Sequence, residues 1–398
     1  MVPKGWSESY LGEVVTYKKG YAFNSSLYAE EGIRIVRISD TTRDSIHSDN
    51  PVFIAGGNVE GLEQYSLFEN DIILSTVGSR PHLLDSMVGK AVKVPRSAHN
   101  SLLNQNLVKL IPKKTKITNE YLFSMLKTKE FIQFISNLVR GNANQVSITL
   151  ADLFKYKFIL PSLPEQKKIA QILSTWDKAI SVTEKLLTNS QQQKKALMQQ
   201  LLTGKKRLLD ENGVRFNGKW EKKLLSDVAD VYQPKTISQS MMSDSGYPVY
   251  GANGVIGFYQ EFNHETEQIA VTCRGSTCGI VNWTQAKSWI TGNAMVINTD
   301  NYSYVSKKFL FYTLNGSDLK YLISGSGQPQ ITGNIKTHII NLPCIEEQQK
   351  IATVLSAADA EIYTLEKKLA CLRDEKKALM QQLLTGKRRV KVDEAVAE

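Results

Sequence analysis

The sequence predicts an α+β fold in which two mixed domains are separated by an antiparallel pair of long coiled-coil helices, with an internal pseudo-twofold repeat. Three observations lead to this prediction. A stretch of sequence recurs late in the chain, both copies follow an apolar heptad pattern, and each copy is preceded by alternating strand-like and helical patterns. With 398 residues, the chain is long enough for two to four compact units.

The repeat is clearest at the end of each half. Residues 194–205 recur letter for letter as residues 376–387, at an offset of 182. The same offset aligns Glu165-Gln166 with Glu347-Gln348. The regions in front correspond at drifting offsets, and their matched pairs are Trp6 with Trp220, Gly32 with Gly246, Gly78-Ser79 with Gly275-Ser276, Asn106 with Asn293, and Gln145 with Gln328. The contrast predicts two variable domains joined to a constant frame.

The frame is predicted to be two long helices. Residues 164–203 form one helical pattern, which Ser162 and Glu165 open as a Ser-x-x-Glu capping box and Gly204 ends. In the second copy, Cys344 replaces the capping Ser162 and weakens that boundary. A 4-3 spacing of mostly apolar residues runs from Ile169 to Leu201 in the first copy, where Thr183, Ser190 and Lys194 are polar, and from Ile351 to Leu383 in the second, where only Lys376 breaks it.

Chain length predicts the direction of the pairing. Forty helical residues span about 60 Å, whereas the connector 208–219 reaches about 40 Å when fully extended. The connector is therefore too short for a parallel pair, and an antiparallel pair is expected. An ordinary helical-bundle core is the alternative explanation for a single stripe, but two copies in the same register favour the coiled coil.

Each half is predicted to contain a mixed domain. The expected strands lie at 33–38, 71–75 and 90–94 in the first half, and at 247–250, 269–272 and 294–297 in the second. One amphipathic helix is expected at 120–137, and another near 308–314.

Charge points to a polyanionic partner. The chain has 49 Lys+Arg against 39 Asp+Glu, a formal net charge of +10, and basic side chains near phosphates release condensed counterions. The basic residues that follow each long helix could contact phosphate or could serve only as helix C-caps.

Several loops contain side chains that can read base edges, because Arg suits guanine and Asn or Gln suits adenine in the major groove. Solvated loop chemistry is the simpler explanation for any single one of them, and the repetition of positions favours the set. The predicted DNA-binding residues are Arg37, Asp40, Thr41, Ser79, Arg80, Asn104, Gln105, Gln145, Tyr250, Asn253, Arg274, Ser276, Gln328 and Gln330.

Other classes of function find little support. The four cysteines lack disulfide or zinc spacing, and the five histidines are scattered. Asn50-Pro51-Val52-Phe53 lacks the second proline of a methyltransferase loop, and Glu221-Lys222-Lys223 is only half of a nuclease motif. No phosphate-binding loop, apolar signal core or membrane-spanning run occurs. We therefore expect a non-catalytic cytoplasmic protein without a metal, although a cryptic methyltransferase or nuclease and a coiled-coil scaffold remain alternatives.

With the duplicated Leu-Pro-x-x-x-Glu-Gln-x-x-Ile-Ala opening and the Gln-Gln-Leu-Leu-Thr-Gly-Lys ending, the whole chain resembles the specificity (S) subunit of type I restriction–modification systems. The resemblance implies that each mixed domain is a target-recognition domain that reads one half of a bipartite, asymmetric DNA target, while the helices set the gap. The implied boundaries are 1–160 and 220–341 for the recognition domains, 161–207 and 342–389 for the spacer helices, 208–219 for the linker and 390–398 for the tail.

The resemblance also implies partners. Two methyltransferase (M) subunits would dock on the helices, restriction (R) subunits would join for cleavage, and double-stranded DNA would be the ligand. The predicted partner-binding residues are Glu165, Gln166, Glu347 and Gln348. No cofactor is expected on this chain, and S-adenosylmethionine, ATP and Mg would belong to the partner subunits.

Overall fold

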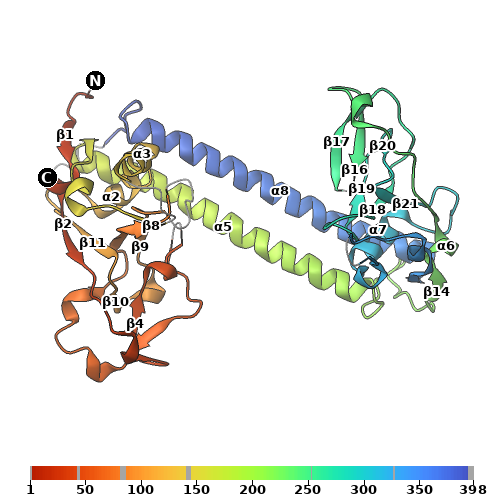
Figure 1. Ribbon diagram of the computed structural model, residues 1–398, viewed down its shortest axis with the longest axis horizontal. Coiled ribbons are helices and arrows are strands. Elements are labelled where there is room, and N and C mark those ends of the chain that lie inside the picture. The colour runs from red at the N-terminus through yellow and green to blue at the C-terminus, as the bar shows by residue number, and fades with distance from the viewer. Residues whose placement is uncertain are drawn as a thin grey trace. The chain divides into compact units, whose positions relative to one another are not determined.

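The computed structural model describes residues 2–42, 45–80, 87–139, 145–251, 253–325 and 328–392 (Figure 1). The chain forms two compact units, Met1–Val182 with Leu369–Glu398, and Thr183–Lys368. Both boundaries fall inside long helices, so each unit contains one mixed domain and part of each helix.

The first unit is built on a four-stranded antiparallel sheet in the order β2-β11-β7-β9. Its strands are β2 (Val15–Lys19), β11 (Leu107–Pro112), β7 (Ile72–Ser75) and β9 (Ala91–Lys93). Alternate side chains of β7 enter different cores: Ile72 and Leu74 join the helical side, whereas Ile73 joins the other side. This period of two shows that the sheet is buried on both faces.

Helices cover one face of this sheet and a second sheet covers the other. The helical side includes α2 (Asn119–Met125) and α3 (Lys129–Leu138). The second sheet has the order β3-β5-β4-β10-β6, with β3 (Tyr28–Ala29), β5 (Val52–Ile54), β4 (Ile33–Val36), β10 (Ser101–Leu103) and β6 (Ser66–Leu67). The smaller elements are β1 (Ser7–Tyr10), α1 (Leu11–Val14), β8 (Val77–Gly78), β12 (Val146–Ser147), α4 (Leu150–Leu153) and β13 (Lys157–Leu160).

The second unit repeats the central sheet in the order β15-β21-β18-β19. Its strands are β15 (Asp230–Tyr232), β21 (Ala294–Asn298), β18 (Ile269–Thr272) and β19 (Val281–Trp283). Here α7 (Lys307–Asn315) lies on the helical side. The second sheet has only three strands, β17-β16-β20, with β16 (Tyr247–Gly251), β17 (Gly254–Tyr259) and β20 (Trp289–Ile290). The remaining elements are β14 (Glu221–Leu224), α6 (Leu225–Val228) and β22 (Ile339–Leu342).

All six predicted strands are confirmed within one or two residues, as β4, β7, β9, β16, β18 and β21. The single helix expected at 120–137 was wrong, because the segment forms both α2 and α3. Thr128 explains the break: its hydroxyl accepts a hydrogen bond from the backbone N of Phe131 at 3.2 Å and so caps a new helix.

The two long helices are confirmed as α5 (Leu163–Leu201) and α8 (Ile345–Leu383), each of 39 residues. Gly204 and Gly386 end them with φ of +69° and +70°, in the left-handed region that favours glycine at a helix C-terminus. Ser162 and Glu165, which the capping box pairs, interact through their side chains: the Ser162 hydroxyl donates to Glu165 Oε2 at 3.1 Å.

Parts of both helices meet within each unit. In the second unit, Ser190 Oγ donates to Glu361 Oε1 at 3.0 Å, and Lys194 forms an ion pair with Asp359. In the first unit, Lys376 forms an ion pair with Asp177. The two ion pairs are related by the 182-residue repeat. None of the predicted heptad positions is exposed.

Candidate nucleic-acid interface

One edge of each unit gathers loops that are distant in the sequence. We call it the polar edge: residues 20–21, 37–41, 76–80, 104–106 and 145–148 in the first unit, and 233, 250–251, 253–254, 273–276, 291–293 and 328–331 in the second. In the first unit, Thr76 N donates to Asn106 O at 2.8 Å, and Ile148 N donates to Thr76 O at 3.0 Å. All fourteen predicted DNA-binding residues lie on these two edges.

The same backbone hydrogen bonds recur in the second unit. Cys273 N donates to Asn293 O at 3.2 Å, and Ile331 N donates to Cys273 O at 3.0 Å. These residues are the repeat counterparts of Thr76, Asn106 and Ile148. The two polar edges therefore share one backbone framework while their side chains differ.

In the first unit a short ladder brings the predicted residues together. Strand β12 pairs antiparallel with β8, and Val146 lies opposite Gly78. One step further along this register, Gln145 lies beside Ser79, with Arg80 next in the chain. Gln145 is exposed, and Ser79 and Arg80 are half-buried.

The corresponding segments of the second unit include an arginine, Arg274. The backbones of Arg274 and Gln330 form an antiparallel β-bridge, and Gly275 N donates to Pro329 O at 3.0 Å. Arg274, Ser276, Gln328 and Gln330 are all exposed. An exposed guanidinium beside two amides can offer hydrogen bonds to base edges or to phosphate.

Arg37, Asp40 and Thr41 are already engaged within the first unit. Arg37 donates to both carboxylate oxygens of Asp40, at 3.2 Å from Nε and 2.8 Å from Nη2, and this contact raises the pKa of Arg37. Asp40 is buried, and the Thr41 hydroxyl donates to Ile38 O at 2.7 Å. These side chains therefore stabilise the loop through contacts within the first unit.

Burial separates the other predicted residues into two groups. Asn104 is buried and its Oδ1 accepts from Gln105 N at 2.7 Å, whereas the Gln105 side chain is exposed. In the second unit, Tyr250 is buried and its hydroxyl accepts from Gln285 N at 3.1 Å. Asn253 is exposed at the turn between β16 and β17. Gln105 and Asn253 are therefore the accessible members of these pairs.

The sequence reasoning missed two exposed residues on the polar edges. Asn106 has a φ of +67°, which places it at the tip of its turn. Gln233 follows β15, and its Nε2 donates to Gly292 O at 3.0 Å. The alignment of Asn106 with Asn293 could have identified the first, but no local pattern singles out Gln233.

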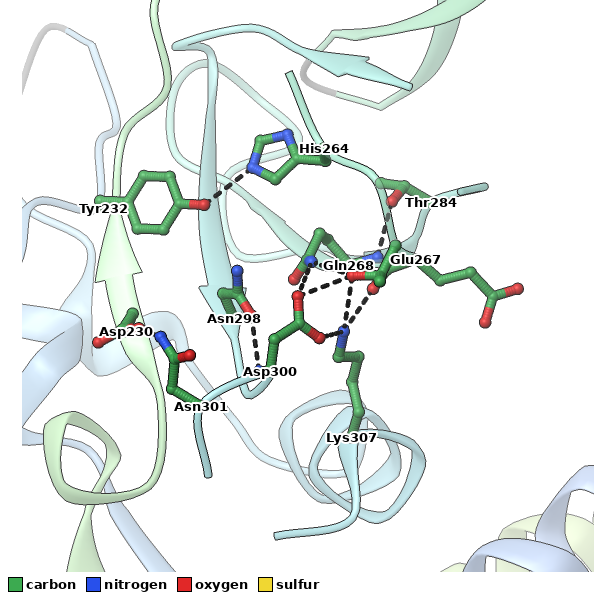
Figure 2. Close-up of polar contacts among 11 residues, drawn as sticks. Asp230, Tyr232, His264, Glu267, Gln268, Thr284, Asn298, Asp300, Asn301 and Lys307 are labelled. Atoms are coloured by element: carbon green, nitrogen blue, oxygen red, sulfur yellow. Dashed lines mark hydrogen bonds and ion pairs between the residues drawn. The ribbon is translucent and has the colours of Figure 1, made fainter. Parts of the chain in front are cut away.

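A second polar cluster lies in the second unit, near the start of β18 (Figure 2). The Asp300 carboxylate accepts from Lys307 Nζ at 2.6 Å and from Thr266 Oγ1 at 2.7 Å. Burial alone would raise the pKa of Asp300, but these hydrogen bonds and that of Gln268 lower it. The cluster joins the start of β18 to the end of β21 and to α7, and we interpret it as structural.

Two buried histidines belong to the same unit. The Tyr232 hydroxyl lies 2.9 Å from His264 Nε2, and Figure 2 draws this hydrogen bond. The Tyr321 hydroxyl lies 2.7 Å from His338 Nδ1. Burial lowers the pKa of both imidazoles. Among the described residues, no group of three or more His, Cys, Asp or Glu side chains could hold a metal ion.

The residues predicted to bind a partner are buried at the starts of the long helices. Glu165 accepts from Arg389, at 2.9 Å from Nε and 2.7 Å from Nη2, and from Trp6 Nε1 at 3.0 Å. Glu347 accepts from Arg207 through both of its oxygens, at 2.6 Å from Nε and from Nη2, and from Trp220 Nε1 at 3.2 Å. This contact raises the pKa of Arg207.

The adjacent glutamines, Gln166 and Gln348, also make equivalent hydrogen bonds to backbone carbonyls. Gln166 Nε2 donates to Lys116 O and to Pro161 O, each at 2.9 Å. Gln348 Nε2 donates to Tyr304 O at 3.1 Å and to Pro343 O at 2.8 Å. All four predicted partner-binding side chains therefore point into their own unit, so any influence they have on a partner would be indirect.

The comparisons with known proteins agree with one another. A family model described as the type I restriction modification DNA specificity domain matches residues 3–189 and 217–371. The chain is 26% identical to the putative type I restriction enzyme MjaX specificity subunit of Methanocaldococcus jannaschii, over 98% of this chain and 95% of that protein. It is 28% identical to the MjaVIII specificity subunit of the same organism, over 53% and 48% of the two chains.

Two solved structures share the fold. The crystal structure of a type I restriction–modification S subunit from M. genitalium matches with a TM-score of 0.65 at 15% identity, over 96% of both chains. A chain from a structural study of complex assembly and conformational transition of the type I R-M system matches with a TM-score of 0.56 at 17% identity, over 98% of this chain and all of that one. No helix in the described part of this chain is long and apolar enough to cross a membrane.

Proposed function

This chain belongs to the type I restriction–modification DNA specificity family, so its function is DNA sequence specificity, and we propose how its two units perform that function. Residues 1–160 and 220–341 act as two target-recognition domains, each of which reads one half of a bipartite, asymmetric target. The spacer helices 161–207 and 342–389 connect them, through the linker 208–219, and residues 390–398 form the tail.

The observation that carries the proposal is the convergence of repeat-related residues on one edge of each unit. Ser79 and Gln145 meet across one ladder, and their counterparts Ser276 and Gln328 lie in the equivalent segments of the other. A shared backbone framework with different exposed side chains suits two domains that read different bases. Arg274 can offer a bidentate contact to guanine, and the Gln and Asn side chains can do so to adenine.

The helices are proposed to form an antiparallel coiled coil that sets the unread gap. The covered heptad positions and the repeat-related ion pairs support this arrangement. In the second unit Ser190 of α5 contacts Glu361 of α8, and Lys194, later in α5, pairs with Asp359, which is earlier in α8. Two segments with that progression run in opposite directions.

The chain acts within a larger complex in this proposal. Two methyltransferase (M) subunits dock on the exposed faces of the helices, and restriction (R) subunits join through them. Methylation and cleavage, with S-adenosylmethionine, ATP and Mg, belong to those subunits, while this chain supplies recognition and no catalytic residue. Glu165, Gln166, Glu347 and Gln348 assist docking indirectly, by fixing each recognition domain to the helices.

Methylome sequencing tests the proposal. A methylation-free host would express this chain with the M subunit of its own system, and a matched host would express the M subunit alone. We expect an adenine-methylated bipartite motif only in the first host. A complex that forms but leaves the genome without a motif would contradict DNA reading, and purified chain that methylated DNA by itself would contradict the non-catalytic role.

A further inference from the structure

Each unit contains one Glu–Arg–Trp cluster around a buried glutamate at the start of a long helix. We call them clamp 1 (Trp6, Glu165 and Arg389) and clamp 2 (Trp220, Glu347 and Arg207). The repeat relates them position by position, because the glutamates and the arginines each differ by 182 residues. Every clamp residue interacts within its own unit.

The correspondence extends beyond the central ion pair. In clamp 2, Arg207 Nη2 also donates to Gly218 O at 3.0 Å, and in clamp 1, Arg389 Nη1 donates to Lys4 O at 2.7 Å. Both carbonyls lie two residues before the clamp tryptophan. The guanidinium carbon of Arg207 lies 5.6 Å from the ring centroid of Trp220, and that of Arg389 lies 5.5 Å from that of Trp6. The same set of partners therefore recurs, although Arg207 contacts both oxygens of Glu347 and Arg389 contacts only Oε1 of Glu165.

A clamp fastens three segments that are remote in sequence. In clamp 2, Glu347 belongs to the first turn of α8, Arg207 follows the end of α5, and Trp220 precedes the first strand of the recognition domain. The adjacent Gln348 adds a fourth segment, because its Oε1 accepts from Ser306 N, the N-cap of α7, at 2.8 Å. The recognition domain is thus held to both helix ends of its unit.

The ion pair of clamp 2 is largely shielded from solvent. Glu347 has 0% exposed side chain and Arg207 has 19%. Charge-assisted, two-pronged contacts of this kind restrict orientation more than single hydrogen bonds do. A DNA duplex advances about 3.4 Å for each base pair, so a domain that tilts on its helix can meet a half-site displaced by one base pair.

We propose that the two clamps are positioning elements that restrict the complex to a single gap length between the half-sites. This inference rests on the proposed function and deepens it. The clamp residues are not members of the polar edges, and the hydrogen bonds described for them reach no polar-edge residue, so loosening a clamp changes the accepted spacing and leaves the recognised bases unchanged. A merely structural role would lower the amount of folded protein without changing the gap.

The test is methylome sequencing of hosts that express the M subunit with the full chain, either wild type or with Glu347→Gln. Glu346→Gln is the matched control, because Glu346 is the exposed neighbour and loses the same charge. Arg207→Lys is a second variant that keeps the charge but removes the planar fork. Melting of the purified complex would be measured for every variant.

For wild type and Glu346→Gln we expect one gap length. For Glu347→Gln and Arg207→Lys we expect about a tenfold rise in the share of methylated sites whose gap differs by one base pair, since a charged hydrogen bond is lost, with both half-sites unchanged. An unchanged single gap in folded variants would overturn the inference. Loss of methylation together with folding in both variants would also overturn it, and a wild type without a bipartite motif would overturn the proposed function as well.

Discussion

The two units have the same central sheet but different second sheets. Strand order, the backbone bonds of the polar edge and the clamp recur in both. In contrast, the second sheet has five strands in the first unit and three in the second, where the exposed edge strand β17 contains Val255 and Ile256. The recurring clamp attaches each domain to the helices, the backbone of the polar edge also recurs, and the exposed side chains of that edge and the second sheet differ. Divergence is therefore concentrated where two different half-sites would be read.

The largest expected difference between the units concerns the clamps. Glu347→Ala leaves Arg207 and the Trp220 indole without their partner, which should cost about 3–5 kcal/mol of unfolding free energy. Glu165→Ala should cost less, about 1–3 kcal/mol, because Arg389 is 41% exposed and water can solvate it. Urea unfolding of the full-length chain measures both. Equal losses would show that burial does not distinguish the clamps.

A smaller difference is expected at the polar edges. Arg274→Ala should weaken binding of the methyltransferase complex to its DNA target by roughly 5- to 150-fold, the range for one bidentate base contact. Gln145→Ala, on the corresponding ladder of the first unit, should weaken it less, because no charge is lost. Affinity measured at fixed salt tests this order. A larger effect of Gln145→Ala would break the correspondence between the two ladders.

The next smaller difference between the units is expected in how the unfolding free energy depends on pH. His264 and His338 of the second unit have pKa values lowered by burial, and for His264 the nearby Asp300 opposes this shift while Lys307 adds to it. The unfolded chain therefore binds more protons below a pH of about 6.5, and stability should fall as the pH decreases through that value. Substituting both histidines with Gln should flatten the slope of unfolding free energy against pH. A slope that survives the substitution would locate the acid sensitivity elsewhere.

The smallest difference concerns the ion pairs between the helices. Lys376→Met removes a partly exposed pair with Asp177 and should cost about 0–1 kcal/mol. Lys194→Met should cost slightly more, because Lys194 also lies 5.7 Å from the Tyr312 ring centroid. Thermal melting of the two variants side by side would show the order. A reversed order would indicate that the Tyr312 contact does not contribute.

Much of this organisation could be predicted from the sequence, because it depends on local periodicity or on the repeat. The ends of α5 and α8 followed from Gly204 and the repeated heptads, and the polar edges followed from aligned positions such as Gln145 and Gln328. Contacts between remote residues could not be predicted in this way. No local pattern pairs Glu165 with Arg389, so the sequence did not reveal that each glutamate binds an arginine of its own unit.

Local chemistry also added contacts that the sequence pattern did not predict. Arg37 and Asp40 are three residues apart, and at that spacing the carboxylate accepts from the arginine directly. The helical pattern at 120–137 was periodic enough to suggest one helix, yet Thr128 starts a second one. In both places a short polar contact outweighed the broader pattern.

Independent reading by the two units is the central claim, and the most direct measurement is the methylome produced by the M subunit with the wild-type chain, with Gln145→Ala and with Arg274→Ala in parallel. We expect that Gln145→Ala relaxes bases in one half-site only, and that Arg274→Ala relaxes bases in the other half-site only. If either substitution altered both half-sites, or if both substitutions altered the same one, the assignment of one half-site to each unit would be contradicted.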